Sequence, residues 1–259
     1  MDLHYQEYGN KDGSLLVFLH GGGVSSWMWD KQIQYFSDYH CVAIDLPEQG
    51  KSKDVTPFSI KISAEKVIDC IKYLAKETKV IVVGFSLGAQ VIVQMLSMKP
   101  NLIDYAIINS ALVRPNWLAS KLISPIVELT FPLIKNKSFS KLQAKTLYVE
   151  KDHFEIYYKE SSNMKSETLI TILQENMAFK IPEDFNKANS RILVTVGERE
   201  KAIMKSSAKD LVLNNPNCTG IIIPKVGHGI SMNNPEFFNQ MIKHWIEKSV
   251  LPRNVVAIK

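Results

Sequence analysis

Six short segments that are almost entirely apolar constrain the fold of this chain more than any other feature. They cover residues 14–20, 40–46, 79–85, 104–110, 191–197 and 219–225. An uninterrupted apolar run is typical of a strand that is buried on both faces of a parallel sheet. Patterns with helical spacing lie between most of the segments, for example at 63–79, where Ser63 is the expected N-cap, and at 87–100. This order predicts an α/β fold with a mostly parallel central sheet flanked by helices.

The stretch from about Arg114 to Asn189 interrupts this alternation. It contains no strong core strand but several helical patterns, at 116–134, 139–150 and 165–179. About 75 residues between two buried strands are too many for a loop. We therefore expect a core domain formed by residues 1–113 and 190–259, with residues 114–189 inserted as a helical lid.

A serine stands where one buried segment changes to a helical pattern. The residues are Gly84-Phe-Ser86-Leu-Gly88, which fit the G-x-S-x-G pattern of a sharp strand-to-helix turn that presents a nucleophile. Glycines two residues before and after the serine let strand and helix approach closely. The free N–H of Leu87, at the start of the helix, would point at an oxyanion formed beside Ser86. An ordinary strand-to-helix turn is the alternative interpretation.

A serine nucleophile needs a histidine base and a carboxylate that orients it. Among six histidines, His228 is the best candidate because it follows the last apolar segment, on a loop at the end of a strand, between two glycines. The segment 191–197 is followed by Glu198 and Glu200, and either could be the carboxylate. Three consecutive glycines after the first segment, Gly21, Gly22 and Gly23, would let backbone N–H groups approach a ligand.

Taken together, these motifs resemble the α/β-hydrolase superfamily, in particular its serine-hydrolase branch of proline iminopeptidases and carboxylesterases with a helical cap. The resemblance spans nearly the whole chain outside 114–189. It implies an α/β-hydrolase fold with the cap inserted between the sixth and seventh core strands. It also implies Gly22 as the second oxyanion donor and Glu200, three residues after Gly197, as the triad acid, with Glu198 as the alternative.

A further loop carries the resemblance with two departures. The family's D-x-P-G-x-G-x-S loop appears here as "DLPEQGKS", residues 45–52, with Glu48 and Gln49 where glycine and often histidine are usual. In the family this loop supports the oxyanion loop and takes no part in the chemistry.

The resemblance implies a serine hydrolase that cleaves a small carboxylic ester through an acyl-serine intermediate, without a cofactor or metal. A serine nucleophile disfavours the haloalkane dehalogenases and epoxide hydrolases of this fold, which use aspartate. Thioesterase, peptidase, lactonase and C–C hydrolase chemistry remain open because they share the triad. A ligand-binding or signalling relative with slow or no turnover is the alternative from a different class.

Composition limits the partners. The net charge is +5 and the lysines are scattered, so no basic stripe for nucleic acid is indicated. Three cysteines at unrelated spacings predict neither disulfides nor a zinc site. No signal peptide is recognised, and no uninterrupted apolar run approaches the roughly 18 residues that span a bilayer. We expect a cytoplasmic protein with a small-molecule ester-like substrate and no membrane partner, and make no prediction of its oligomeric state.

Overall fold

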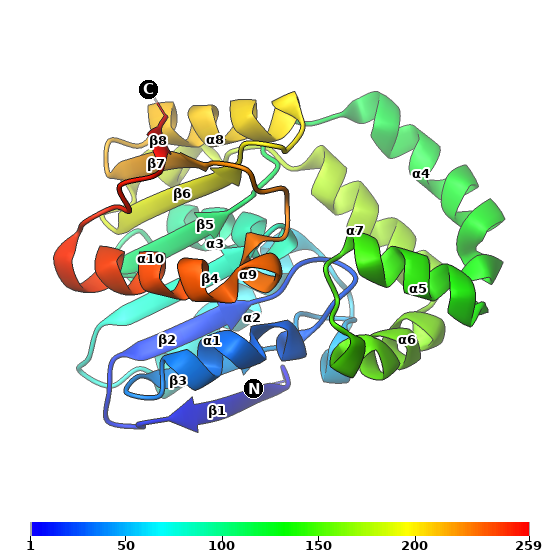
Figure 1. Cartoon of the computed structure of the whole chain (residues 1–259), viewed down its shortest axis with the longest axis horizontal. Helices are drawn as coiled ribbons and strands as arrows, with labels where there is room; N and C mark the ends of the chain where they lie inside the picture. The colour runs from blue at the N-terminus through cyan, green and yellow to red at the C-terminus, as the bar shows by residue number, and fades with distance from the viewer. Residues whose placement is uncertain (1, 259) are drawn as a thin grey trace.

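The computed structural model describes residues 2–258, which form an eight-stranded sheet of order β1-β3-β2-β4-β5-β6-β7-β8 (Figure 1). The strands are β1 (Tyr5–Gly9), β2 (Leu15–Leu19), β3 (His40–Ile44), β4 (Val80–Phe85), β5 (Tyr105–Asn109), β6 (Arg191–Gly197), β7 (Cys218–Ile223) and β8 (Val256–Ala257). The strands from β3 to β7 in this order run parallel, while β1 and β8 are antiparallel at the two edges. The prediction of a mostly parallel central sheet is confirmed.

Ten α-helices and five short 3₁₀ helices connect the strands within the described residues. The α-helices are α1 (Asp30–Tyr35), α2 (Ile60–Leu74), α3 (Leu87–Met98), α4 (Trp117–Thr130), α5 (Lys137–Thr146), α6 (Phe154–Asn163), α7 (Ser166–Ala178), α8 (Ala202–Asn214), α9 (Ile230–Asn233) and α10 (Pro235–Lys248). The 3₁₀ helices are η1 (Ser26–Trp29), η2 (Gly50–Ser52), η3 (Phe131–Lys135), η4 (Lys151–His153) and η5 (Glu183–Lys187).

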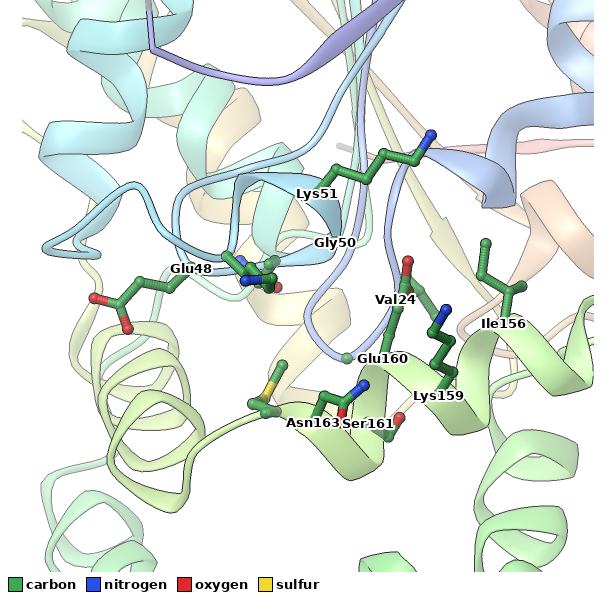
Figure 2. Close-up of a pocket in the computed structure, with 13 residues that line it drawn as sticks. Val24, Glu48, Gly50, Lys51, Ile156, Lys159, Glu160, Ser161 and Asn163 are labelled. Carbon is green, nitrogen blue, oxygen red and sulfur yellow. The ribbon is translucent and has the colours of Figure 1, made fainter.

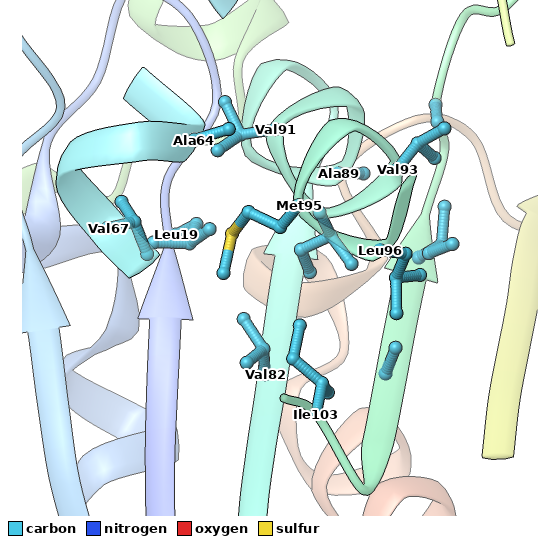
Figure 3. Packing of buried hydrophobic residues seen from close by; sticks show 14 of the residues in the cluster. Leu19, Ala64, Val67, Val82, Ala89, Val91, Val93, Met95, Leu96 and Ile103 are labelled. Atoms are coloured by element: carbon cyan, nitrogen blue, oxygen red, sulfur yellow. The ribbon is translucent and has the colours of Figure 1, made fainter. Parts of the chain in front are cut away.

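The sheet separates two hydrophobic cores, which explains why its central strands are apolar throughout. Along β2, Val17 belongs to the core that includes α2, α3 and α8, whereas Phe18 belongs to the core that includes α1 and α10. Successive side chains of a strand point to opposite faces, so a covered sheet buries both sets. Figure 3 shows the first core, where Met95 of α3 lies close to Val82 of β4 and Leu19 of β2.

The residues between β5 and β6 leave the sheet and form α4 to α7, which lie beyond the carboxyl ends of the parallel strands (Figure 1). By the order of strands in this sheet, the insertion stands between the fifth and sixth strands. The expectation that it follows the sixth strand is wrong, because five strands, β1 to β5, precede the insertion among the described residues.

The start of α2 also differs from the expectation. The N-cap is Ser59, whose Oγ accepts a hydrogen bond from the N–H of Ile62 at 3.0 Å. Ser63 lies inside the helix and donates its hydroxyl to the carbonyl of Ser59 at 2.7 Å. Ser59 has an extended backbone, as an N-cap requires, and Ile60 next to it is buried in the core. Pro235 is the first residue of α10.

One helical stretch within residues 2–258 is long and apolar enough, by length and composition, to cross a membrane. It is Trp117–Lys135, which comprises α4 and η3, and only 11% of its apolar 18-residue window is buried. The stretch is not an uninterrupted apolar run in the sequence, because Lys121 and Glu128 divide it.

Candidate active site

Ser86 stands at a sharp turn between β4 and α3, in the backbone conformation that such a turn requires. Its φ of 52° and ψ of −108° are strained for a residue with a side chain. A Cβ at Gly84 would lie 2.6 Å from the backbone of Gly88, and one at Gly88 would lie 2.3 Å from the carbonyl oxygen of Leu19. The two glycines are therefore needed for strand and helix to meet. The N–H of Ser86 donates to the carbonyl of Asn109 at 2.8 Å, which fixes the turn to β5.

His228 and Glu200 form a hydrogen-bonded pair. Nδ1 of His228 lies 2.7 Å from Oε2 of Glu200. The side chain of Glu200 is 2% exposed, whereas that of His228 is 42% exposed. Because the carboxylate is an acceptor, Nδ1 carries the proton and Nε2 is left free to accept one. Glu198 does not join this pair, since its side chain is exposed and Oε2 accepts from the backbone N–H of Lys225 at 2.8 Å.

Glu200 is held as a carboxylate by its hydrogen bonds. Burial alone would raise its pKa, but the hydrogen bond and the charge of His228, the N–H of Gly197 and the hydroxyl of Ser110 together outweigh burial and lower the pKa. Oε1 accepts from the Ser110 hydroxyl at 2.7 Å and from the Gly197 N–H at 2.8 Å. Glu200 is therefore ionised and can orient the imidazole and stabilise its charged form.

Three residues of this site were not found from the sequence. Ser110, which follows β5 with a φ of 59°, donates its hydroxyl to Glu200. The ring of Phe85 packs on His228 with 4.9 Å between the ring centroids. A Cβ at Gly229 would lie 2.4 Å from the ring of Tyr148, so Tyr148 from the insertion packs against the His228 loop. Each contact joins segments far apart in sequence, and no local pattern marks it.

The glycine loop after β2 reaches the start of α3. A Cβ at Gly22 would meet Ile172 of α7 at 3.6 Å and the side chain of Leu87 at 3.8 Å, so the two expected oxyanion donors are neighbours. Leu87 is the first residue of α3, and its N–H has no partner in the preceding turn. Gly21 faces Phe85, which a Cβ would approach to 2.8 Å, and Gly23 has a φ of +80° that glycine adopts freely.

His20, directly before the glycines, is a structural residue. It is fully buried, its Nδ1 lies 2.8 Å from the carbonyl of Gly21, and its Nε2 accepts from the N–H of Leu46 at 3.0 Å. These two bonds place the proton on Nδ1. Burial lowers the pKa of His20 despite the opposing effects of Asp45 and the Gly21 carbonyl. The imidazole therefore stays neutral and ties the glycine loop to the loop after β3.

The loop after β3, residues 45–52, holds Glu48 at a position where the family usually has glycine. Glu48 has a φ of 60°, which explains why glycine is usual there. Its carboxylate accepts from the N–H of Phe58 at 2.9 Å and from the hydroxyl of Thr168 in α7 at 2.7 Å. A Cβ at Gly50 would lie 2.6 Å from the carboxyl carbon of Asp45, so this glycine is required. Glu48 thus joins the core to the insertion.

Ser86, Glu200 and His228 line one cavity of about 890 Å³. Tyr148 and Asn176 border it from the insertion. Its lining also contains three cationic side chains, namely Arg199, Lys201 and Lys225. The structure therefore brings the three expected catalytic residues to one cavity, with the insertion as its other wall.

A second cavity, of about 380 Å³, lies between the loop at 48–51 and α6 (Figure 2). Glu160 of α6 borders it and accepts hydrogen bonds from the Ser25 hydroxyl and from Nε1 of Trp27, both at 3.0 Å. Burial raises the pKa of Glu160, and these two hydrogen bonds oppose the shift. Through these hydrogen bonds Glu160 connects α6 to Ser25 and Trp27, which follow the glycine loop, and so helps to hold the insertion against the core. Among residues 2–258, no group of three or more His, Cys, Asp or Glu side chains is arranged to hold a metal.

Comparisons with known proteins agree with this architecture. Residues 16–241 match the family model described as "Alpha/beta hydrolase family". A putative 2-succinyl-6-hydroxy-2,4-cyclohexadiene-1-carboxylate synthase from Haemophilus influenzae is 34% identical over 76 residues, 29% of this chain and 31% of the relative. An (E)-2-((N-methylformamido)methylene)succinate hydrolase from Acinetobacter baylyi is 23% identical over 256 residues, 94% of each chain.

Among solved structures, an esterase from Exiguobacterium antarcticum superposes with a TM-score of 0.78 at 16% identity, covering 95% of this chain and 96% of that one. At this identity the likeness concerns the fold. The chain belongs to the alpha/beta hydrolase family.

Proposed function

We propose that this protein is a serine hydrolase that cleaves a small carboxylic ester through an acyl-serine intermediate. The observation that carries the proposal is the 2.7 Å contact between His228 Nδ1 and Glu200, in a cavity that Ser86 also lines. A buried ionised carboxylate that orients a half-exposed imidazole, in one cavity with a serine on a strained turn, is the arrangement that nucleophilic acyl transfer needs.

In this mechanism, Nε2 of His228 takes the proton of Ser86 while the serine oxygen attacks the ester carbonyl. The N–H groups of Leu87 and Gly22 stabilise the oxyanion of the tetrahedral intermediate. His228 then gives its proton to the leaving alcohol, and the acyl-serine forms. A water molecule, deprotonated by His228, attacks the acyl-serine, and the acid leaves as His228 returns this proton to the oxygen of Ser86. Glu200 stabilises the imidazolium in both halves of the reaction.

We further propose that the ester carries a carboxylate. Arg199, Lys201 and Lys225 line the cavity, whereas Glu200 is the one carboxylate in the lining, and its charge is already paired with His228. The excess of positive charge favours an anionic substrate over a neutral one. The relative from Acinetobacter baylyi, whose name describes it as hydrolysing a succinate derivative, is consistent with this choice.

The nucleophile is tested with Ser86→Ala and a panel of activated esters. Because alanine removes the attacking oxygen and leaves the turn intact, we expect hydrolysis to fall to the buffer rate while circular dichroism stays unchanged. A fluorophosphonate probe should label the wild type and not the variant. Turnover that survives Ser86→Ala contradicts the proposal, and so does rapid labelling of a wild type that hydrolyses no ester, because that result indicates a binding protein.

The substrate charge is tested separately with a monoester of succinic acid and a neutral ester of equal chain length. We expect Arg199→Gln to raise KM for the monoester, by about tenfold or less, because a partly exposed ion pair contributes little binding free energy. KM for the neutral ester should be unchanged. Equal effects on both esters contradict the anionic preference without bearing on the nucleophile.

A further inference from the structure

The outward face of α4 and η3 carries a row of large apolar side chains that are mostly exposed to solvent. The row, here called the α4 stripe, consists of Leu118, Leu122, Ile126, Leu129 and Leu133, which are 46–81% exposed. Their spacings of four, four, three and four residues place them along one side of a helix. In Figure 1, α4 runs along the outer edge of the insertion, away from the sheet.

The side of α4 opposite the α4 stripe is also apolar. Ile123 and Val127 are buried, and α4 packs against α7. Packing against α7 therefore accounts for one apolar face and leaves the α4 stripe unexplained. Monomeric proteins rarely expose contiguous apolar surface of this extent unless it is an interaction site.

The charges around the α4 stripe indicate what covers it. Residues 117–149 contain five lysines and a single carboxylate, that of Glu128. One of the five, Lys137, is ion-paired with Glu155 of α6, which leaves four. Lys121 lies one turn after Leu118, next to the stripe, and is exposed. An exposed apolar row beside lysines is the pattern of a helix that lies in the interface of an anionic bilayer, with the lysines near the phosphates.

We propose that α4 and η3 dock this protein on the surface of anionic phospholipid membranes. Lys121 and Glu128 are charged and exposed, and the other face is committed to α7, so the helix lies in the plane of the interface and does not span the bilayer. A second copy of the chain is a poorer occupant, because a symmetric contact would bring two sets of four lysines together, without counting the paired Lys137. This proposal departs from the expectation of no membrane partner, which considered only membrane-spanning runs.

Trp117 provides a built-in reporter for the test. It stands at the start of α4 and is 66% exposed, whereas Trp27, Trp29 and Trp245 are at most 8% exposed. Mixing the protein with vesicles of phosphatidylcholine and 30% phosphatidylglycerol should shift the tryptophan emission to the blue, and brominated acyl chains should quench it. Both signals should be lost in Trp117→Phe, although this variant still sediments with the vesicles.

The stripe itself is tested by sedimentation with the same vesicles. We expect Leu122→Glu combined with Leu129→Glu to weaken binding at least tenfold, because each places a carboxylate against an anionic surface. Leu213→Glu on α8, where the leucine is 69% exposed, is the matched control and should bind as the wild type does. Vesicles of phosphatidylcholine alone, or 0.5 M salt, should weaken wild-type binding about tenfold or more.

Two results overturn the proposal. If the wild type does not sediment with anionic vesicles at low salt, no bilayer docks on this face, and a dimer that Leu122→Glu with Leu129→Glu dissociates would identify a second copy as the occupant. If Leu213→Glu weakens binding as much as the stripe variant does, the attraction is general and the α4 stripe is not its site. Ester hydrolysis in solution should be the same for all these variants, which separates this test from that of the proposed function.

Discussion

Replacing Glu200 by glutamine tests how the site sets the protonation of His228. Oε1 of Glu200 accepts two donors, the Ser110 hydroxyl and the Gly197 N–H. The hydroxyl can rotate away, but the backbone N–H cannot, and leaving it unpaired in this buried place costs about 1–3 kcal/mol. The amide oxygen of the introduced glutamine therefore takes the Oε1 position, and its NH₂ group faces Nδ1 of His228.

The consequence is a change of tautomer. A donor opposite Nδ1 requires Nδ1 to be unprotonated, so the neutral ring carries its proton on Nε2, the nitrogen that should accept the proton of Ser86. The equivalent change in a serine protease lowers kcat about 10⁴-fold. At about 1.36 kcal/mol for each factor of ten, this is roughly 5.4 kcal/mol of lost transition-state stabilisation.

The assay is kcat for an activated ester at saturating concentration, with circular dichroism to verify the fold. Glu198→Gln is the matched control, because its carboxylate is exposed and bonds only the N–H of Lys225 in the contacts given above. We expect it to change kcat less than twofold. A loss below tenfold for Glu200→Gln, or an equal loss for Glu198→Gln, would refute the assignment of Glu200 as the orienting acid.

Three further predictions concern stability and reactivity. Gly88→Ala should lower the free energy of unfolding in urea by about 3 kcal/mol, because its Cβ would lie 2.3 Å from the Leu19 carbonyl oxygen. In the control Gly22→Ala the nearest contact of the Cβ would be 3.6 Å, so this variant should lose much less stability. Equal losses in the two variants would contradict the prediction. Burial lowers the pKa of His20, so the unfolded chain binds a proton on this residue more readily than the folded chain does. The free energy of unfolding should therefore fall as the pH is lowered below about 6.5, by up to about 1.4 kcal/mol per pH unit from this group. A free energy of unfolding that stays constant between about pH 7 and 5.5 would contradict this. Burial raises the pKa of Cys70 to about 12, so a thiol reagent at pH 8 should modify it only after unfolding, and fast modification of the native protein would disprove its burial.

The fold could be predicted from the sequence because its strongest signals are local. A strand buried on both faces is apolar at nearly every position, and β2 to β5 show this apart from His40 at the start of β3 and Asn109 at the end of β5. Elements without a strong local pattern were not predicted. The helix α6 has a single fully buried residue, Tyr157, and the edge strand β8 is two exposed residues long, so neither leaves a clear periodic pattern.

The candidate site was predictable where a motif requires particular residues at fixed spacing. The turn around Ser86 needs glycines because their Cβ atoms would collide with backbone, and the sequence displays them. The choice between Glu198 and Glu200 came from the family register, and the geometry favours Glu200. Ser110 could not be found, because its partner is 90 residues away and only the pairing of β5 with β6 brings them together.

The most direct measurement of the central claim is the mass of the protein trapped during turnover. An activated ester is mixed with the enzyme, the reaction is quenched in acid within milliseconds to seconds, and the peptides are mapped by mass spectrometry. The account predicts a single acyl group on the peptide that contains Ser86, absent in Ser86→Ala and persistent when deacylation is slowed. An acyl group on another residue, or full turnover with no acyl-enzyme at any time, would contradict it.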